Sequence, residues 1–288
     1  MSSMTTTQIP RTAGQPGRAV GLSGRPTWPS SMPGLWGVLA WVIVLLTLTP
    51  LVWLVSTALT GGNPGASLAN FREVLGTGDF LATYVNSLVV SLSTTLFTVA
   101  FGVTSGYTLA RTRTRSTRWM GIWIVLVRMA PPMGFALPFF LMMQKLQLLD
   151  TYPALVLVYL TVTLPFATWL MAGFFQSIPV ELEEAARIDG CSRIRALFSV
   201  VLPAARPGIA TVAIFSFIAS WNEFFYPLVI AGRTTKTASL ALQGYVSSAG
   251  IETGLLCAGA VLVLLPALLF TALAQKGLVR GLTHGAVK

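Results

Sequence analysis

Six long apolar stretches constrain the fold of this chain more than any other feature of its sequence. They cover residues 34–57, 85–109, 119–143, 152–175, 208–231 and 254–274. Each is near or above the roughly 20 residues that a helix needs to cross a bilayer. Because lipid offers no hydrogen-bond partner to an open backbone, such stretches form helices. The sequence therefore predicts an all-α polytopic membrane protein with six transmembrane helices.

Basic residues predict the orientation of these helices. Of the 19 Lys and Arg residues, 14 lie in the two terminal segments and in the loops 110–118 and 176–207, whereas the other three loops hold four. This bias predicts a multi-pass protein of the cell (inner or plasma) membrane with both termini cytoplasmic. The formal charge of +10 is scattered over loops rather than gathered on one face, so we expect no nucleic acid among the partners.

Composition divides the chain into three parts. Residues 1–33 are rich in Ser, Thr, Gly and Pro, which predicts a disordered cytoplasmic tail. Residues 34–275 form the membrane domain, and residues 276–288 form a cytoplasmic C-terminal tail. A cleaved signal peptide is the competing explanation of residues 34–57, but the apolar run and its polar leader are both too long for one. In the external loop 58–84, residues 67–76 predict a short amphipathic helix.

The most charged block lies between two apolar stretches, at residues 179–203. Pro179 and the acidic residues after it favour a helix start, and Gly190 is placed to end that helix in a left-handed conformation. Ser192 can cap a second short helix that Pro203 closes. Its expected apolar stripe consists of Ile194, Leu197, Phe198 and Val201. Two short helices that meet at a glycine predict a compact knob, suited to a groove on another protein.

This block resembles the EAA loop of binding-protein-dependent ABC importer permeases. The motif positions Glu184, Ala185, Ala186, Gly190, Leu202 and Pro203 fit in register, and Val200 stands where the pattern prefers Ile. The resemblance implies a type I permease fold with a cytoplasmic coupling helix in the loop 177–206. It assigns contact with the ATPase to Glu184, Ala185, Ala186, Asp189, Gly190, Leu202 and Pro203. A soluble helix-turn-helix is disfavoured because apolar stretches flank the block.

Several apolar stretches carry residues that are costly in lipid. Polar residues from Asn86 to Thr95 either bond neighbouring helices or line a pore, and both explanations stay open. Pro131 and Pro132 should break the third stretch and expose carbonyls. Arg128 and Glu223 should face a cavity or each other, either in a solute pathway or as a structural ion pair.

The run from Ser220 to Tyr226 combines aromatic, amide and carboxylate side chains, a set that suits a sugar. The run resembles the maltose-type, carbohydrate-importing branch of the same family, as do Asn86-Ser87, the segment 107–111 and the C-terminal segment 281–288. We expect the substrate path to include Asn86, Arg128, Trp221, Asn222, Glu223 and Tyr226.

The resemblance implies membrane lipid and three protein partners: a second permease subunit, a dimer of ATP-binding subunits and an extracytoplasmic solute-binding protein, which the loop 232–253 would approach. No Lys follows a Gly, so a Walker A loop is absent and ATP and Mg would be bound by the partner ATPase. We expect no cofactor, metal or catalytic residues in this chain. The alternatives are a stand-alone secondary transporter with an Arg128 and Glu223 charge relay, and an intramembrane enzyme, for which no catalytic set is recognisable.

Overall fold

The computed structural model describes residues 34–61, 67–76, 78–112, 114–129, 131–247 and 250–285. The predicted disordered tail 1–33 lies outside these residues. The long helices are α1 (Gly34–Thr60), α3 (Asp79–Arg111), α4 (Arg115–Met129), α5 (Pro132–Lys145), α6 (Tyr152–Ser177), α10 (Arg206–Trp221) and α13 (Thr253–Gly285). The short elements are α2 (Ala69–Gly76), α7 (Glu181–Ile188), α8 (Arg193–Ala196), the π-helix η1 (Leu197–Val201), α9 (Leu202–Ala204), α11 (Phe225–Ile230), α12 (Ala238–Ala241), the 3-10 helix η2 (Leu242–Tyr245), and an antiparallel pair of strands, β1 (Val246–Ser247) and β2 (Gly250–Ile251).

The chain divides into two compact units, residues 1–50 and 51–288. In the first unit the described residues belong to α1. This helix confirms the one expected over residues 34–57 and carries no charged residue. In the second unit α2 confirms the short helix expected near 67–76, and the Ser67 hydroxyl accepts a hydrogen bond from the Ala69 N–H at 3.0 Å.

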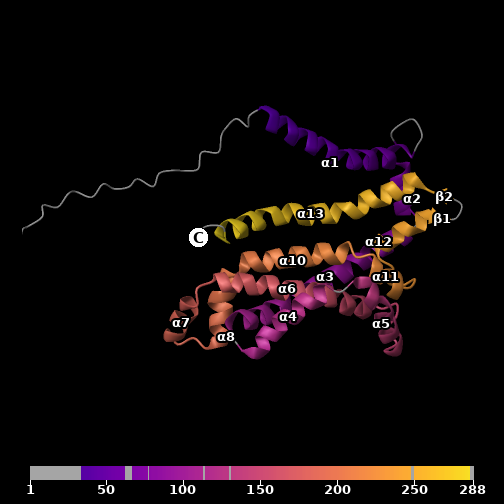
Figure 1. Cartoon of the computed structure of the whole chain (residues 1–288). Helices are drawn as coiled ribbons and strands as arrows, with labels where there is room; N and C mark the ends of the chain where they lie inside the picture. Colours follow the sequence, from indigo (N-terminus) through magenta and orange to yellow (C-terminus); the bar gives the residue numbers. More distant parts are fainter. Residues whose placement is uncertain are drawn as a thin grey trace, which may run out of the picture. The chain divides into compact units, whose positions relative to one another are not determined.

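Helices α3, α6 and α10 form the centre of the second unit (Figure 1). The backbones of α3 and α6 approach closely because α3 carries glycine at the contact. A Cβ added at Gly102 would lie 2.8 Å from the Ala167 Cβ, and one at Gly106 would lie 2.6 Å from the Met171 Cβ. These two glycines, four residues apart, therefore permit the close packing of α3 on α6.

Polar residues of α3 join it to its neighbours. The Thr98 and Thr163 hydroxyls are 2.7 Å apart, and so are those of Ser105 and Thr168. Both pairs link α3 to α6. Thr98 and Ser105 lie outside the predicted set from Asn86 to Thr95, for which both explanations stay open. Of that set, the Ser87 hydroxyl accepts from the Ala238 N–H at 2.7 Å.

The count of six transmembrane helices is not confirmed. Among the described residues, four helices are long and apolar enough to cross a membrane. A fifth crossing results if Arg193–Ala204 and Arg206–Trp221, which meet at an angle of 74°, are counted as one bent span. The stretch 119–143 instead divides into α4 and α5. Pro131 has an extended backbone (φ −67°, ψ 128°) and precedes α5, which starts at Pro132. Proline disfavours helix in the residue before it and lacks the N–H that a continuous helix needs, so the expected break is confirmed.

Two other boundaries also differ from the sequence prediction. The stretch 208–231 is not one helix, because α10 ends at Trp221 and the separate α11 starts at Phe225. The last helix does not end near residue 274, since the backbone of α13 stays helical to Gly285 and covers most of the segment expected to be a C-terminal tail.

Candidate functional site

The charged block forms the predicted helix–glycine–helix knob. Gly190 follows α7 with φ +88°, the left-handed conformation expected for it. The N–H of Cys191 bonds the Ala186 carbonyl at 3.0 Å, five residues back, as in a glycine C-cap. The Ser192 hydroxyl accepts from the Arg195 N–H at 3.3 Å and caps α8, as predicted. A Cβ at Gly190 would meet nothing within 4 Å, so glycine is favoured here by its backbone angle alone.

The second half of the knob differs from the prediction. Pro203 does not close a helix but lies in the first turn of α9, after the π-helix η1, and the chain bends only at Ala205. In η1 the Leu202 N–H bonds the Leu197 carbonyl, five residues back. Proline is tolerated in a first turn, where its missing N–H leaves no helical bond unmade.

The predicted apolar stripe is split between two faces. Leu197 and Val201 pack inward against the bundle, whereas Ile194 and Phe198 are 71% and 63% exposed. In α7, Ala186 is buried, Ala185 is exposed, and Ile188 is 87% exposed. The most exposed large apolar side chains of the knob are therefore Ile188, Ile194 and Phe198, which we call the apolar triad. Together they give the knob apolar surface that a partner could cover.

Of the other predicted coupling residues, three are exposed and two are half-buried. Glu184, Asp189 and Gly190 are exposed on the knob, while Leu202 and Pro203 are half-buried near its return to α10. All seven predicted residues therefore lie on the knob or where it returns to α10.

A largely buried ion pair that the sequence did not predict ties the knob to the helix bundle. The Arg111 Nε donates to a Glu183 carboxylate oxygen at 2.6 Å, and the Tyr107 hydroxyl donates to the other oxygen at 2.8 Å. The Arg111 and Glu183 side chains are only 13% and 12% exposed. We call these three side chains the clamp. The available signals were the i, i+4 spacing of Tyr107 and Arg111 and their likeness to the maltose-type branch.

Arg111 also donates hydrogen bonds to carbonyls at the C-terminal end of α6. Its two terminal nitrogens donate to the carbonyls of Phe175 and Ile178 at 2.9 and 3.0 Å. These carbonyls lie at a helix C-terminus, where a cation is favoured. One guanidinium group therefore joins the end of α3, the end of α6 and the start of the knob.

The break between α10 and α11 holds the predicted Asn222 and Glu223. Asn222 is exposed, and Glu223 is half-buried. One carboxylate oxygen of Glu223 accepts from the N–H groups of Phe225 and Tyr226 at 2.9 and 3.3 Å. An anion suits the positive N-terminal end of a helix, so Glu223 is stabilised there without a described cation. Arg128 lies in α4, but its side chain is outside the described part of the structure, so the predicted Arg128 and Glu223 pair stays a prediction.

Two other predicted path residues, Trp221 and Tyr226, are buried in the core. Trp221 is 1% exposed, and its indole N–H donates to the Val263 carbonyl at 2.9 Å. Tyr226 is 3% exposed and packs edge-to-face on Phe139. Trp221 and Tyr226 thus flank the break that holds Asn222 and Glu223 and anchor it in the core.

Asn86, the third predicted path residue that is buried, binds the loop 231–238. It donates to the carbonyls of Thr234 and Lys236 at 2.9 and 3.0 Å and accepts from the Tyr152 hydroxyl at 2.6 Å. Its amide is therefore committed to holding this loop.

Asp150 fastens the same loop. Its carboxylate accepts from the N–H groups of Gly232, Thr234 and Thr235 and from the Thr235 hydroxyl, at 2.8 to 3.1 Å. Partial burial opposes ionisation, but the hydrogen bonds outweigh it and hold the pKa of Asp150 well below its usual range. Within the loop 232–253, Leu240 points inward and is 7% exposed, whereas the strand residues Val246 and Ile251 are 48% and 58% exposed.

The described residues hold no cluster of three or more His, Cys, Asp or Glu side chains that could bind a metal ion. The break interrupts a bundle of apolar helices, and the clamp joins the knob to that bundle. A charged knob attached to such a bundle is typical of a membrane protein with a docking surface outside the lipid.

The family is established by comparison. Residues 98–284 match the model of the binding-protein-dependent transport system inner membrane component, and the chain belongs to this family. It is therefore the permease component of an ABC importer and not its ATPase subunit. This membership decides against the stand-alone secondary transporter and the intramembrane enzyme.

Relatives and solved structures agree with this assignment. The chain is 40% identical over 223 residues to a putative ABC transporter permease protein of Streptomyces antibioticus, which covers 77% of this chain and 97% of that protein. It is 32% identical to the trehalose transport system permease protein SugB of Mycobacterium tuberculosis, over 88% of this chain and 97% of that one. In fold it resembles a chain of a bacterial ABC transporter that imports the polysaccharide alginate, with a TM-score of 0.74, 23% identity, and coverage of 84% of this chain and 94% of that chain.

Proposed function

We propose that this permease subunit imports a sugar or sugar-like solute as one half of a permease heterodimer. Its partners would be a second permease subunit, a dimer of ATP-binding subunits and an extracytoplasmic solute-binding protein. ATP and Mg would bind to the ATPase alone. The relatives named for trehalose, and for trehalose and maltose in Thermococcus litoralis, support the solute class.

The observation that carries the coupling proposal is the apolar triad on a knob clamped to the bundle. Ile188, Ile194 and Phe198 provide apolar surface for a groove in the ATPase. Closure of the ATPase dimer would move the knob, and the Glu183 and Arg111 pair would pass that movement to the ends of α3 and α6. Because the pair is largely shielded from water, separating its charges is costly, which keeps the knob joined to the bundle.

The solute path is proposed at the break between α10 and α11. Non-helical backbone at membrane depth is tolerated where it lines a cavity or lies inside protein. The exposed Asn222 amide and the free oxygen of Glu223 can bond solute hydroxyls, while Trp221 and Tyr226 hold the break in position. We assign these two aromatic side chains and Asn86 to positioning rather than to direct contact, because their exposed area is small and Trp221 and Asn86 are also hydrogen-bonded.

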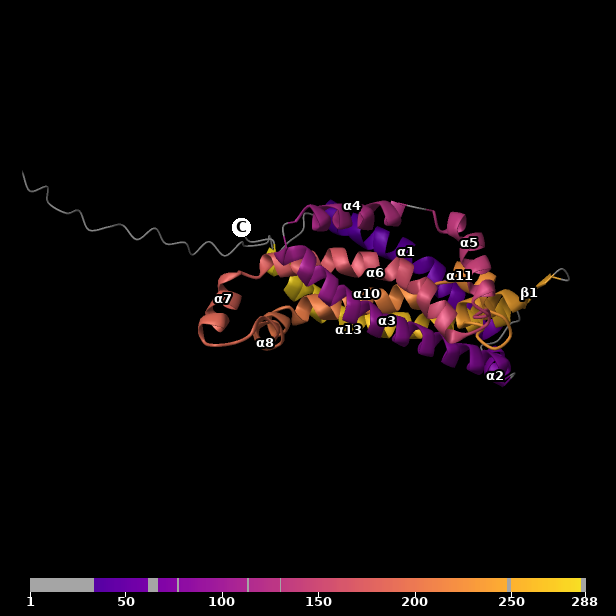
Figure 2. The same cartoon turned by 90° about the horizontal axis from the view of Figure 1, so that it is seen from below.

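The binding protein is proposed to contact the strand pair at residues 246–251. The apolar side chains of the strand pair are exposed, and the pair lies at the end of the unit 51–288 opposite to the knob (Figure 2). One structural neighbour is an alginate importer in complex with a pentasaccharide-bound periplasmic protein, which supports this kind of contact. With the knob and both termini in the cytoplasm, as the Lys and Arg distribution favours, the strand pair would be outside.

The test is uptake by the reconstituted transporter, prepared from this chain and the partner subunits that copurify with it. Vesicles receive the binding protein and one labelled sugar at a time, with and without ATP inside. We expect ATP-dependent uptake of at least one sugar and none with amino acids. Uptake that an ion gradient drives without ATP, or selection of a non-sugar solute, would contradict the proposal.

A second experiment tests the path itself. Single cysteines replace residues from Ser220 to Phe225 in a Cys191→Ser, Cys257→Ser background. We expect positions 222 and 223 to react with a small polar reagent in at least one nucleotide state. Protection of both positions in every nucleotide state would remove the break from the path.

A further inference from the structure

The second half of the knob contains a π-helix inside an otherwise α-helical segment. Residues 193–204 are helical throughout, as α8, η1 and α9, and then bend by 74° into α10. In η1 the Leu202 N–H bonds the Leu197 carbonyl, five residues back, whereas the Ala205 N–H bonds the Val201 carbonyl, four residues back, at 2.8 Å. The π-helix therefore adds one residue to a single turn of this segment.

The burial of side chains follows the same register. Ala196, Val201 and Ala205 are 2%, 0% and 2% exposed, so the buried positions are five and then four residues apart. In an uninterrupted α-helix, the residues four and seven positions before Val201, which are Leu197 and Ile194, would lie on its face. Leu197 does pack inward, but Ile194 is 71% exposed. The extra residue of η1 thus explains why the predicted apolar stripe is split.

Pro203 gives a physical reason for this π-helix. If residues 193–204 formed one α-helix, Pro203 would lie in its interior, where its ring would clash with the Ser199 carbonyl and no N–H could bond that carbonyl. The wider turn of η1 shifts the hydrogen bonds immediately before the proline. Because η1 ends at Val201, Pro203 falls instead in the first turn of α9.

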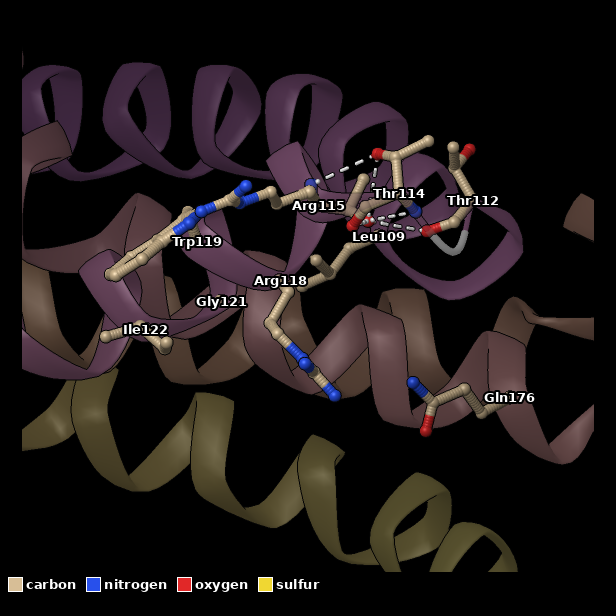
Figure 3. Close-up of a pocket in the computed structure, with 10 residues that line it drawn as sticks. Leu109, Thr112, Thr114, Arg115, Arg118, Trp119, Gly121, Ile122 and Gln176 are labelled. Atoms are coloured by element: carbon tan, nitrogen blue, oxygen red, sulfur yellow. Dashed lines mark hydrogen bonds between the residues drawn. The ribbon is translucent and has the colours of Figure 1, made fainter.

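Side-chain caps do not set the direction of this segment. In the turn between α3 and α4, the Thr117 hydroxyl donates to the Thr112 carbonyl at 2.7 Å and accepts from the Thr114 N–H at 3.0 Å (Figure 3). By contrast, η1, α9 and α10 each start without a side-chain hydrogen bond. The backbone register at η1 therefore determines which side chains of α8 and η1 point outward.

We propose that Pro203 is a positioning residue for coupling, because it keeps η1 in the π register and so turns Ile194 and Phe198 outward, toward the ATP-binding subunit. One residue corresponds to about 100° of helix rotation. Without the π-helix, that rotation would carry Ile194 inward and Ala196 outward. Pro203 is itself half-buried, so it acts through these side chains. The role in coupling rests on the proposed function, whereas the register does not.

Cysteine labelling measures the register directly. In a Cys191→Ser, Cys257→Ser background, Ile194→Cys and Ala196→Cys are introduced separately into the full chain. The chain is purified in detergent with the second permease subunit and without the ATP-binding subunits, so that no partner covers the knob. We expect position 194 to react with a charged maleimide at least tenfold faster than position 196. Pro203→Ala supplies the N–H and removes the ring, so it should invert this order.

Three variants make the labelling decisive. Pro203→Ser also carries an N–H and should invert the order as well, which guards against a folding defect of the alanine variant. Pro207→Ala is the matched control: Pro207 lies in the first turn of α10, and the carbonyl four residues back already accepts from the Ala205 N–H, so the order should stay unchanged. Val212→Cys, at a buried position of α10, should stay unreactive throughout and show that the bundle is folded.

Two labelling results would overturn the assigned register. One is an unchanged order of positions 194 and 196 in both Pro203 variants. The other is a similar rise in reactivity at both positions, because that indicates a loosened knob and not a rotated helix.

Transport separates the register from its role in coupling. In vesicles with the ATP-binding subunits and the binding protein, Pro203→Ala should lower the amount of solute transported per ATP hydrolysed at least fivefold, and Pro207→Ala should not. An inverted labelling order with a normal transport ratio would overturn the role of Pro203 in coupling. Failure of the wild type to take up any sugar would contradict the proposed function, while the labelling result would still decide the register.

Discussion

The two ends of the unit 51–288 are built differently. At one end, the knob exposes its apolar triad and is joined to the bundle by the side chains of Glu183, Arg111 and Tyr107. At the other end, the loop 231–238 is fastened through its own backbone: Asp150 and Ser87 accept from its N–H groups, and Asn86 donates to its carbonyls. The knob is thus held at a few points, whereas the loop is held along its length.

We expect this difference to distinguish a part that moves from a part that stays fixed. A segment joined to the bundle by one clamp and the packing of Leu197 and Val201 can tilt as a unit while the Arg111 and Glu183 pair stays intact. A loop bonded through successive backbone groups has little freedom and can serve as a frame for the helices around the solute path. We therefore expect mutations in the knob to impair coupling and mutations around Asp150 to impair stability.

The largest effect is expected at Gly190. Its φ of +88° is strained for any residue with a Cβ, by about 1–2 kcal/mol, although the space around it is open. Gly190→Val should redirect α8 and separate Ile194 from Ile188, so uptake should fall at least tenfold at a normal membrane level. Gly190→Asn is the matched control, because Asn tolerates this conformation and should retain more uptake. Equal uptake by the wild type and Gly190→Val, measured in vesicles, would contradict the assigned shape of the knob.

The clamp should show the next largest effect. Breaking a buried pair leaves an uncompensated charge, at a cost of about 3–5 kcal/mol. Glu183→Gln should therefore lower the amount of solute transported per ATP hydrolysed several-fold, while Glu181→Gln, on the exposed face of the same helix, should not. The double exchange Arg111→Glu with Glu183→Arg should restore part of the coupling that Arg111→Glu alone removes. No restoration would argue that Glu183 acts without Arg111.

A substitution at Asp150 tests the other end, where this side chain holds the loop 231–238. Asp150→Asn replaces a carboxylate that accepts four hydrogen bonds, each of which contributes about 1.5–3 kcal/mol when charged. We expect a lower thermal unfolding temperature in detergent but a normal ratio of transport to hydrolysis. A normal unfolding temperature with a lowered ratio would reverse the roles assigned to the two ends.

The pH dependence of this effect follows from the direction of the pKa shift. The folded pKa of Asp150 lies below its ordinary value of 3.8, so its stabilisation is complete above that value and is lost only as the pH falls below it. The stability difference between the wild type and Asp150→Asn should thus be constant from about pH 5 to 8 and shrink in stronger acid. A difference that varies between pH 6 and 8 would point to another group.

The smallest effect is expected at the strand pair. Val246→Ser with Ile251→Ser removes exposed apolar area and should weaken stimulation of ATP hydrolysis by the loaded binding protein a few-fold, with basal hydrolysis unchanged. Leu75→Ser, an exposed apolar position on α2, is the control. A deletion through Leu240 would test this contact poorly, because that side chain is buried and its loss would disturb the fold.

Much of this architecture could be predicted from residues that act on their neighbours in the sequence. Long apolar runs indicated the helices, Pro131 and Pro132 indicated the break before α5, and Gly190 with Ser192 indicated the knob. These features depend on neighbours in the sequence. The break after Trp221 is followed by Pro227, which cannot donate a helical hydrogen bond to the Glu223 carbonyl four residues back. The sequence prediction did not take this proline into account and expected the stretch 208–231 to be one helix.

Long-range contacts explain what the sequence could not show. Arg111 and Glu183 are 72 residues apart, and nothing in either local pattern pairs them. Trp221 and Asn86 looked like solute ligands because aromatic and amide groups suit sugars, but in the fold their polar atoms bond Val263, Thr234 and Lys236. Periodicity likewise placed Leu197 and Val201 with Ile194 and Phe198 on one stripe, whereas packing against the bundle buried only the first two.

Cysteine cross-linking tests the central claim most directly, because it asks which partner each end contacts. In a Cys191→Ser, Cys257→Ser background, Ile188→Cys and Val246→Cys are introduced separately into the assembled transporter with its binding protein. The account predicts that a short bifunctional reagent joins position 188 to the ATP-binding subunit and position 246 to the binding protein. Cross-linking of position 188 to the binding protein, or of position 246 to the ATP-binding subunit, would contradict the assignment of the knob as the coupling element.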